Sequence, residues 1–116
     1  MNNIFLIPSL LVIIKHKNIM FIIRETFIAK PGHAGPFAKI MKDEMKKWKE
    51  FKGYVMLDVV TNYNTIVVEY EMESLAEFEK MMVSHKAEQA KSKDTNPPAY
   101  TQLYDTGKRE IFKVVE

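Results

Sequence analysis

Two polar side chains lie on the apolar sides of amphipathic segments, and these two have the greatest potential for chemistry. Leu75, Phe78 and Met82 follow the spacing of one helix face, and His85 continues the series. Glu44 holds a similar place in an earlier segment, among apolar residues three to four positions away. An imidazole can act as a general base, a proton shuttle or an axial ligand, and a carboxylate can orient it. His85 and Glu44 are therefore the candidate catalytic residues.

Both residues also have purely structural interpretations. His85 can be a hydrogen-bonded histidine of the core or its rim, and Glu44 can reach solvent or pair with Lys47. One histidine and one glutamate on separate helices are too few donors to specify a metal site, so we predict none. If a pocket exists, the apolar residues of the two segments form its walls, namely Phe37, Met41, Trp48, Phe78 and Met82.

Four segments have the composition of β-strands. Residues 20–29, 54–60 and 65–72 are rich in β-branched and aromatic side chains, and a short asparagine-containing link between the last two predicts a hairpin. Residues 101–116 supply a closing strand, with a bend expected near Gly107.

Apolar residues at helical spacing predict one helix over residues 36–51 and another over residues 74–91. The second begins with Ser74, and Glu77 three positions later completes the pattern of a capping box. Residues 92–100 contain two prolines that cannot continue a helix, so this segment is predicted to be a loop.

The resulting order, β-α-β-β-α-β, predicts the α+β class and the ferredoxin-like split fold, an antiparallel sheet with two helices on one face. The other face of the sheet has no cover. In residues 54–60 and 65–72 both alternating sets contain apolar side chains, and a sheet that is apolar on both faces does not leave one of them in water. We therefore expect a homodimer that pairs through the uncovered face.

Composition limits the classes of function. The 116 residues, 47% hydrophobic and 28% charged, suit one globular domain. The sequence has no cysteine, which fits a reducing compartment and leads us to expect a cytoplasmic protein. Without Lys15 and Lys17, the 17 basic residues fall to 15 and equal the 15 acidic ones, which argues against a nucleic-acid partner. The sequence contains no phosphate-binding loop or dinucleotide fingerprint, and we expect no cofactor.

Residues 1–19 differ in character from the rest of the chain. Their apolar run, Ile4 to Ile14, is shorter than the ~20 residues that span a bilayer, and Pro8 interrupts it. Its lysines follow the run, whereas a secretory signal has them before it. We expect a dispensable extension or a mis-assigned start, with an edge strand or a weak membrane anchor as alternatives. Residues 20–116 form the expected domain, and a membrane partner is not favoured.

Residues 20–116 resemble the dimeric α/β-barrel superfamily, whose members pair two ferredoxin-like units sheet to sheet. The resemblance rests on GYVMLDVVTNYNTIVVEYEMESLAEFEKMM (residues 53–82), a hairpin followed by the entry to a helix, and on the final GKREIFKV strand (residues 107–114). It is closest to NIPSNAP-type and small monooxygenase-like members. The resemblance implies the fold and the dimer, but its motifs are patterns of shape and imply no particular reaction.

Heme-degrading members of the superfamily place an axial histidine on the second helix, where His85 stands. They also use an asparagine on the first strand and a tryptophan before the histidine, whereas residues 20–29 contain no asparagine and Phe78 stands where the tryptophan would be sought. Heme binding is therefore the least favoured interpretation. Two hypotheses remain. The first is a NIPSNAP-like dimeric protein that binds a small apolar or aromatic molecule. The second is a cofactor-independent, monooxygenase-like enzyme with His85 and Glu44 in its pocket.

Overall fold

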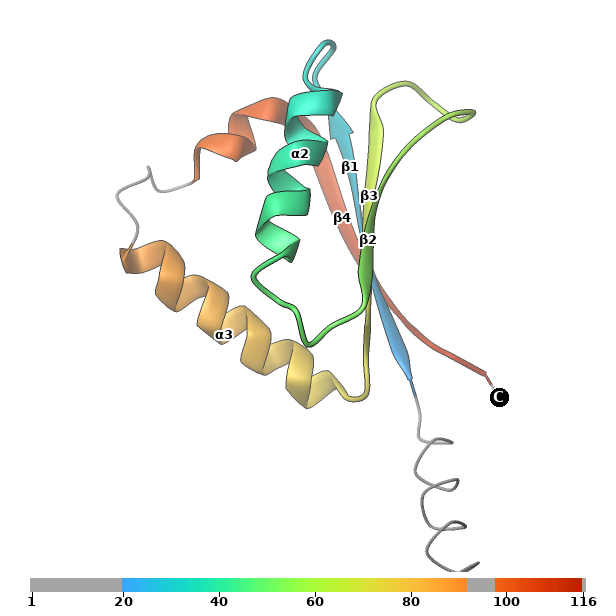
Figure 1. Cartoon of the computed structure of the whole chain (residues 1–116). Helices are drawn as coiled ribbons and strands as arrows, with labels where there is room; N and C mark the ends of the chain where they lie inside the picture. Colours follow the sequence, from blue (N-terminus) through green and yellow to red (C-terminus); the bar gives the residue numbers. More distant parts are fainter. Residues whose placement is uncertain (1–19, 92–97, 116) are drawn as a thin grey trace, which may run out of the picture.

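The computed structural model describes residues 20–91 and 98–115 (Figure 1). The predicted extension, residues 1–19, and most of the predicted loop, residues 92–97, lie outside the described residues. The elements follow one another as β1 (Phe21–Ala29), α2 (Ala34–Met45), β2 (Gly53–Leu57), β3 (Thr65–Met72), α3 (Leu75–Lys91), the 3-10 helix η1 (Ala99–Leu103) and β4 (Tyr104–Lys113). None of the described helices is long and apolar enough to cross a membrane.

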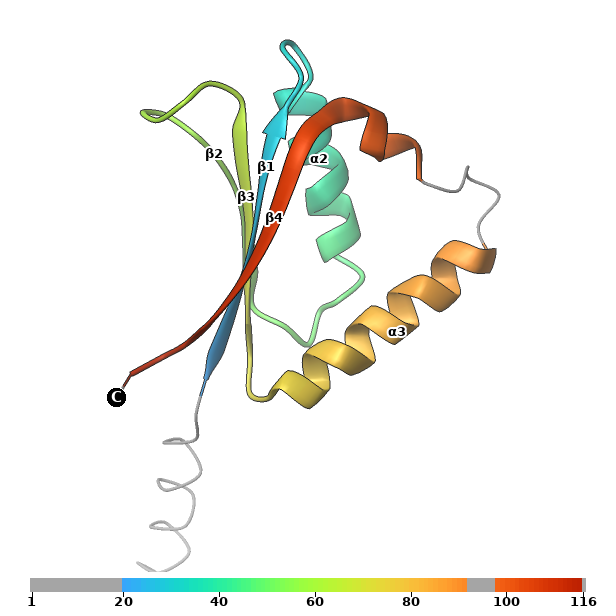
Figure 2. The ribbon, with the colours of Figure 1, turned by 180° about the vertical axis from the view of Figure 1, so that it is seen from behind.

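The four strands form one antiparallel sheet in the order β2-β3-β1-β4, so the first strand lies in the interior between β3 and β4. Both helices lie on the same face of the sheet, and no described element covers the other face (Figures 1 and 2). The order of elements and the layers confirm the α+β ferredoxin-like fold that the sequence predicts.

The core lies between the sheet and α2. Alternate residues of β3 point toward the helices and are buried, whereas the residues between them are part-exposed, as period-2 alternation requires. Ile66 of β3, Ile23 of β1 and Phe37 of α2 are completely buried at its centre. Phe27 packs edge-to-face on Phe37, with the ring centroids 5.0 Å apart. These contacts fix α2 against the sheet.

The first helix ends earlier than its apolar spacing predicts. It was expected over residues 36–51 and it covers Ala34–Met45, followed by turns in which the amide of Trp48 donates to the Met45 carbonyl. The chain must return here from the helix layer to the sheet, where β2 starts at Gly53. A Cβ at that position would stand 2.9 Å from the Glu69 carbonyl oxygen and from the sulfur of Met45. Glycine therefore permits the close approach of β2 to β3 beneath the end of the helix.

Strand β2 is also shorter than predicted, because it ends at Leu57 instead of residue 60. Beyond it, the Thr61 hydroxyl donates to the Asp58 carboxylate at 2.9 Å, and Asn64 adopts the left-handed conformation with φ of 62°. Asparagine accepts this conformation more readily than most residues, which favours a turn at this point. The connecting loop is therefore residues 58–64, longer than the four-residue link that the sequence suggests.

Helix α3 begins as predicted. The Ser74 hydroxyl accepts a hydrogen bond from the Glu77 amide at 3.2 Å, and the Glu77 carboxylate accepts one from the Glu73 amide at 2.9 Å. This reciprocal arrangement is a capping box in which the glutamate reaches one residue further back than usual. In contrast to α2, the helix contains no buried residue. It starts near the sheet and diverges from it toward Lys91 (Figures 1 and 2).

The last strand, β4, starts at Tyr104, because the three preceding residues belong to η1 instead of the predicted strand. Its pairing with β1 shifts register at Ala29, where Tyr104 is the partner and Asp105 is the extra residue of a bulge. The irregularity lies two residues before Gly107, which lies against Phe27: a Cβ at Gly107 would stand 3.1 Å from the Phe27 ring.

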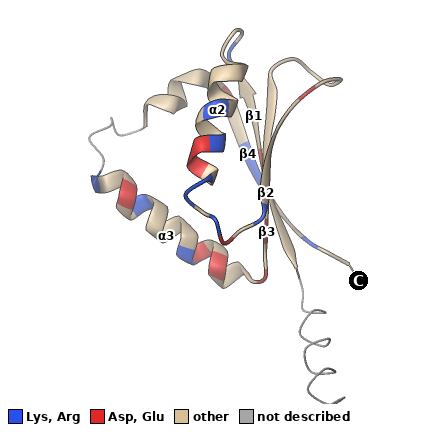
Figure 3. Cartoon of the chain, in the orientation of Figure 1, with Lys and Arg blue, Asp and Glu red and all other residues tan. Residues whose placement is uncertain are grey.

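The uncovered sheet face combines apolar side chains with an internal ion pair. Tyr54, Met56 and Phe112 are exposed on it. Arg24 Nε donates to Glu69 at 2.7 Å, and the Arg24 guanidinium lies 5.1 Å from the Phe112 ring centroid. On the opposite side of the molecule, acidic and basic residues are interleaved along α2 and α3 (Figure 3), so neither helix presents a surface of one sign.

Candidate functional site

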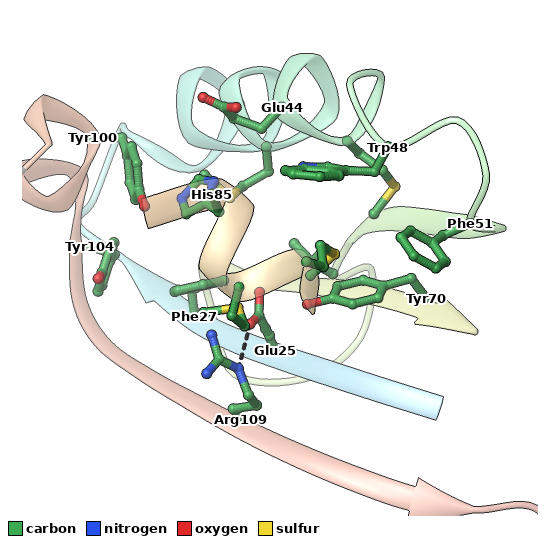
Figure 4. A pocket seen from close by; sticks show the side chains of 15 residues that line it. Glu25, Phe27, Glu44, Trp48, Phe51, Tyr70, His85, Tyr100, Tyr104 and Arg109 are labelled. Atoms are coloured by element: carbon green, nitrogen blue, oxygen red, sulfur yellow. Dashed lines mark hydrogen bonds and ion pairs between the residues drawn. The ribbon is translucent and has the colours of Figure 1, made fainter. Parts of the chain in front are cut away.

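A cavity of about 270 Å³ lies on the helix-bearing face of the sheet (Figure 4). Ligand pockets in proteins commonly occupy about 300–1,000 Å³, so this cavity lies just below the usual range and has space only for a small molecule. Its walls come from β1, β3 and β4, from α2 and the turn after it, from α3, and from η1. The lining residues are Glu25, Phe27, Met41, Glu44, Met45, Trp48, Phe51, Val68, Tyr70, Met81, Met82, His85, Tyr100, Tyr104 and Arg109.

The walls are mainly apolar and polarisable. Met41 and Met45 of α2 and Met81 and Met82 of α3 line the cavity, and aromatic rings complete the lining. Methionine is unbranched and polarisable, so it fills irregular gaps and adapts to the shape of a neighbour. Such walls accommodate apolar ligands of more than one outline.

A charged pair forms the sheet side of the cavity. Arg109 of β4 stands directly opposite Glu25 of β1 in the antiparallel register, and Arg109 Nε lies 2.6 Å from Glu25 Oε2. The Glu25 side chain is 16% exposed and that of Arg109 is 44% exposed. The Arg109 guanidinium also lies 5.3 Å from the ring centroid of Phe78, which is a cation–π contact between β4 and α3. Arg109 therefore connects the sheet to α3 while neutralising Glu25.

Two tyrosines of the cavity have perturbed acidities. Burial raises the pKa of the Tyr70 phenol well above its ordinary value, and the charge of Glu25 together with a hydrogen bond to that carboxylate raises it further. Burial also raises the pKa of the Tyr100 phenol, with smaller contributions from Tyr104, Glu44 and Glu25. Both phenols are thus held neutral, as hydrogen-bonding groups, over the physiological pH range.

His85 and Glu44 both line the cavity, one on each helix. The His85 side chain is part-buried, and no hydrogen bond or ion pair joins it to another residue within 20–91 or 98–115. Glu44 is 32% exposed and its Oε2 lies 3.0 Å from Lys47 Nζ, which is the lysine pairing considered from the sequence. In Figure 4 the imidazole lies among the side chains of the cavity, and Glu44 lies at its edge on α2.

Two solved structures resemble this fold. One is a NIPSNAP family protein from Agrobacterium tumefaciens str. C58, with 13% sequence identity and a TM-score of 0.59 over 80% of this chain and 90% of that chain. The second, a NIPSNAP family protein of unknown function from the same organism, has 18% identity and a TM-score of 0.58, over 85% of this chain and 91% of that chain. The chain has the fold of the NIPSNAP proteins. No protein-family model matches the sequence, and no curated protein matches it either.

The resemblance stated from the sequence is thus confirmed for the fold, and at these identities it carries no statement about activity. Within this NIPSNAP-like fold, three of the five predicted wall residues line the cavity, namely Met41, Trp48 and Met82. The other two need correction. Phe37 is fully buried in the closed core, because α2 turns it toward Phe27 and the sheet. Phe78 packs against Arg109 instead of lining the cavity.

The pair Glu25–Arg109 was not found from the sequence. Glu25 belongs to the same alternating set as Ile23 and Phe27, so a charged residue on the apolar face of a strand was the available signal. Arg109 gave no such signal, because its place opposite Glu25 depends on the register between two strands that are far apart in the chain.

The arrangement suits binding and orientation of a small molecule. Phenols and a carboxylate can make hydrogen bonds inside apolar walls, which is the usual composition of a ligand pocket. Among residues 20–91 and 98–115, no group of three histidine or acidic residues is placed to hold a metal ion.

Proposed function

We propose that this NIPSNAP-like protein binds a small apolar or aromatic molecule in the cavity between the sheet and the two helices. The observation that carries the proposal is the combination of a 270 Å³ volume with methionine and aromatic walls. Transfer of apolar surface from water into such walls is favourable, by about 25 cal/mol per Å². No observation favours the monooxygenase-like alternative, so binding is the proposed function.

The polar groups of the cavity would orient the ligand. Glu25 is already engaged by Arg109 and Tyr70, so these three groups form a fixed polar patch on the sheet side. His85 and Glu44 stand on the helix side. A ligand with one hydrogen-bonding group on an apolar body matches this distribution. Its polar group can bond to a polar side chain of the cavity, so neither is left without a hydrogen bond when the ligand binds.

The test is to fill the cavity. Met82→Trp places a larger side chain in the wall, on a helix that holds no buried residue. Val83→Trp is the matched control, because Val83 is the next residue of α3, is 64% exposed and does not line the cavity. Titration with 2-phenylethanol, followed by NMR shifts of the cavity residues, should show binding to the parent and to Val83→Trp, with at least about tenfold weaker binding to Met82→Trp. Equal binding by Met82→Trp and Val83→Trp contradicts the proposal.

We also propose that the protein forms a homodimer through the uncovered sheet face. Tyr54, Met56 and Phe112 are exposed on that face. Among its charged residues, Arg24 pairs with Glu69 and Lys108 with Glu110. An exposed apolar patch of this kind marks an interaction surface, and charges that are already paired cost less to bury than single ones.

Light scattering at micromolar concentration should give the mass of a dimer. Met56→Lys, on the uncovered face, should shift it toward the monomer, and Val83→Lys, on the outer side of α3, should not. A monomeric parent protein overturns the dimer.

A further inference from the structure

We infer that the cavity selects an organic cation, a protonated amine on an aromatic or apolar body, with its ammonium group beside Glu44. This inference rests on the proposed binding function and further specifies that the ligand carries a positive charge. It follows from three features of the lining: an arginine that is already paired, a carboxylate with free capacity, and several aromatic rings.

The cavity disfavours an anionic ligand. Arg109 is the one lysine or arginine among the described lining residues, and its Nε is held 2.6 Å from Glu25 Oε2. Its guanidinium is further engaged by the Phe78 ring. Glu25, which is 16% exposed, already neutralises the Arg109 guanidinium, so an anion on the remaining N–H groups of that guanidinium would lie beside a carboxylate of the same charge. Like charges held close together in a part-buried site repel each other.

Of the two lining carboxylates, Glu44 is the one that can receive a cation. Glu25 has both Arg109 and Tyr70 as partners. Glu44 is paired through Oε2 with Lys47, whose side chain is exposed and does not line the cavity. A surface pair of this kind contributes little free energy, so a ligand cation can share or replace it at low cost. Tyr100 lies near enough to Glu44 for the carboxylate charge to contribute to the raised pKa of its phenol.

The aromatic rings add a second attraction. Trp48 and Tyr100 line the same cavity as Glu44 (Figure 4). Ring faces carry negative charge density and attract cations, and aromatic lining is how proteins recognise ammonium groups. The methionines of the two helices would then surround the apolar body of the ligand.

The experiment compares three probes that share a phenyl ring and have similar size: 2-phenylethylamine, protonated at neutral pH, uncharged 2-phenylethanol and anionic phenylacetate. Titration of the full chain by NMR or calorimetry should give the order amine, alcohol, anion, with the amine about tenfold tighter than the alcohol. Binding of the alcohol or the anion as tightly as the amine overturns the inference but leaves the binding function standing. Binding of none of the three overturns the binding function itself.

Glu44→Gln tests the assigned carboxylate. It should weaken the amine about fivefold and leave the alcohol unchanged. Asp43→Asn is the matched control, because it removes the same charge from the neighbouring position of α2, where Asp43 pairs with Lys46 and does not line the cavity. It should leave both affinities unchanged. An equal loss in the two variants means that the charge acts at long range and overturns the assignment to Glu44.

Discussion

The two helices share one face of the sheet but are attached to it in different ways. Helix α2 inserts Phe37, which has no exposed surface, into the centre of the core. Helix α3 has 17 residues and none is buried. Its contacts with the sheet include the Phe78 ring under Arg109 and part-buried Met81 beside the core. The cavity lies where the second helix does not close the core.

This difference explains where a binding site can exist in so small a domain. A well-packed interior has no space for a ligand, because its side chains interdigitate at high density. The α2 side follows that rule, whereas α3 faces the sheet across methionines and a histidine. Helix α2 thus contributes mainly to stability, and α3 mainly to the proposed binding site. This division of roles between the two helices can be tested by substitution.

Phe37→Ala should have the largest effect on stability. It removes a completely buried aromatic ring that packs on Phe27 and Tyr104, and such truncations cost about 3–5 kcal/mol. Chemical denaturation measures the loss. Leu75→Ala on α3 is the control, and because Leu75 is exposed it should cost less than about 1 kcal/mol. Comparable losses in the two variants contradict the division.

Arg109→Met should have the next largest effect, about 2 kcal/mol, because it leaves the part-buried Glu25 carboxylate without its ion pair and removes the cation from Phe78. Lys108→Met is the control on the adjacent position, where an exposed lysine pairs with Glu110 at 3.7 Å. That change should stay within about 0.5 kcal/mol. Equal effects would show that the Glu25 pair has no special role.

Ser74→Ala should cost about 1 kcal/mol, since the Glu77 amide loses the hydroxyl that caps α3. Ser74→Asp retains an acceptor at this position and should recover most of the loss. Thermal unfolding compares the three proteins, and the melting temperature of Ser74→Ala should fall by a few degrees. An unchanged melt in Ser74→Ala would mean that α3 does not depend on its capping box.

His85→Ala should have the smallest effect, within about 0.5 kcal/mol, because the imidazole has no partner among the described residues and alanine has the higher helix propensity. Thermal unfolding beside Lys86→Ala, its exposed neighbour, measures the difference. A loss of about 1–3 kcal/mol would instead identify His85 as a hydrogen-bonded core residue, the alternative that the sequence left open.

Local signals in the sequence account for most of what could be predicted. The β-branched and aromatic residues of 65–72 mark β3, and the capping box marks the start of α3. The end of α2 was missed because Trp48 and Phe51 continue the apolar spacing of the helix while they lie in turns. Apolar spacing reports which residues face the interior, and it does not distinguish a helix from a turn that follows it.

The residues of the candidate site also fall into a group that nearby sequence predicts and a group that it does not. Helical phase placed His85 and Glu44 on the cavity side of their helices, since that property depends only on neighbours in sequence. The pairing of Glu25 with Arg109 depends on strand register across 84 positions of the chain, and a lone charge in a strand pattern does not reveal its partner.

The absence of buried residues on α3 also has a kinetic consequence. The free energy of opening a segment follows the apolar surface that the opening exposes, and a helix without buried residues can detach while the sheet and α2 stay folded. Amide hydrogens of α3 should therefore exchange with solvent faster than those of α2, through a sub-global opening and not through complete unfolding. The same opening would widen the cavity, because Met81, Met82 and His85 of its lining would move away with α3.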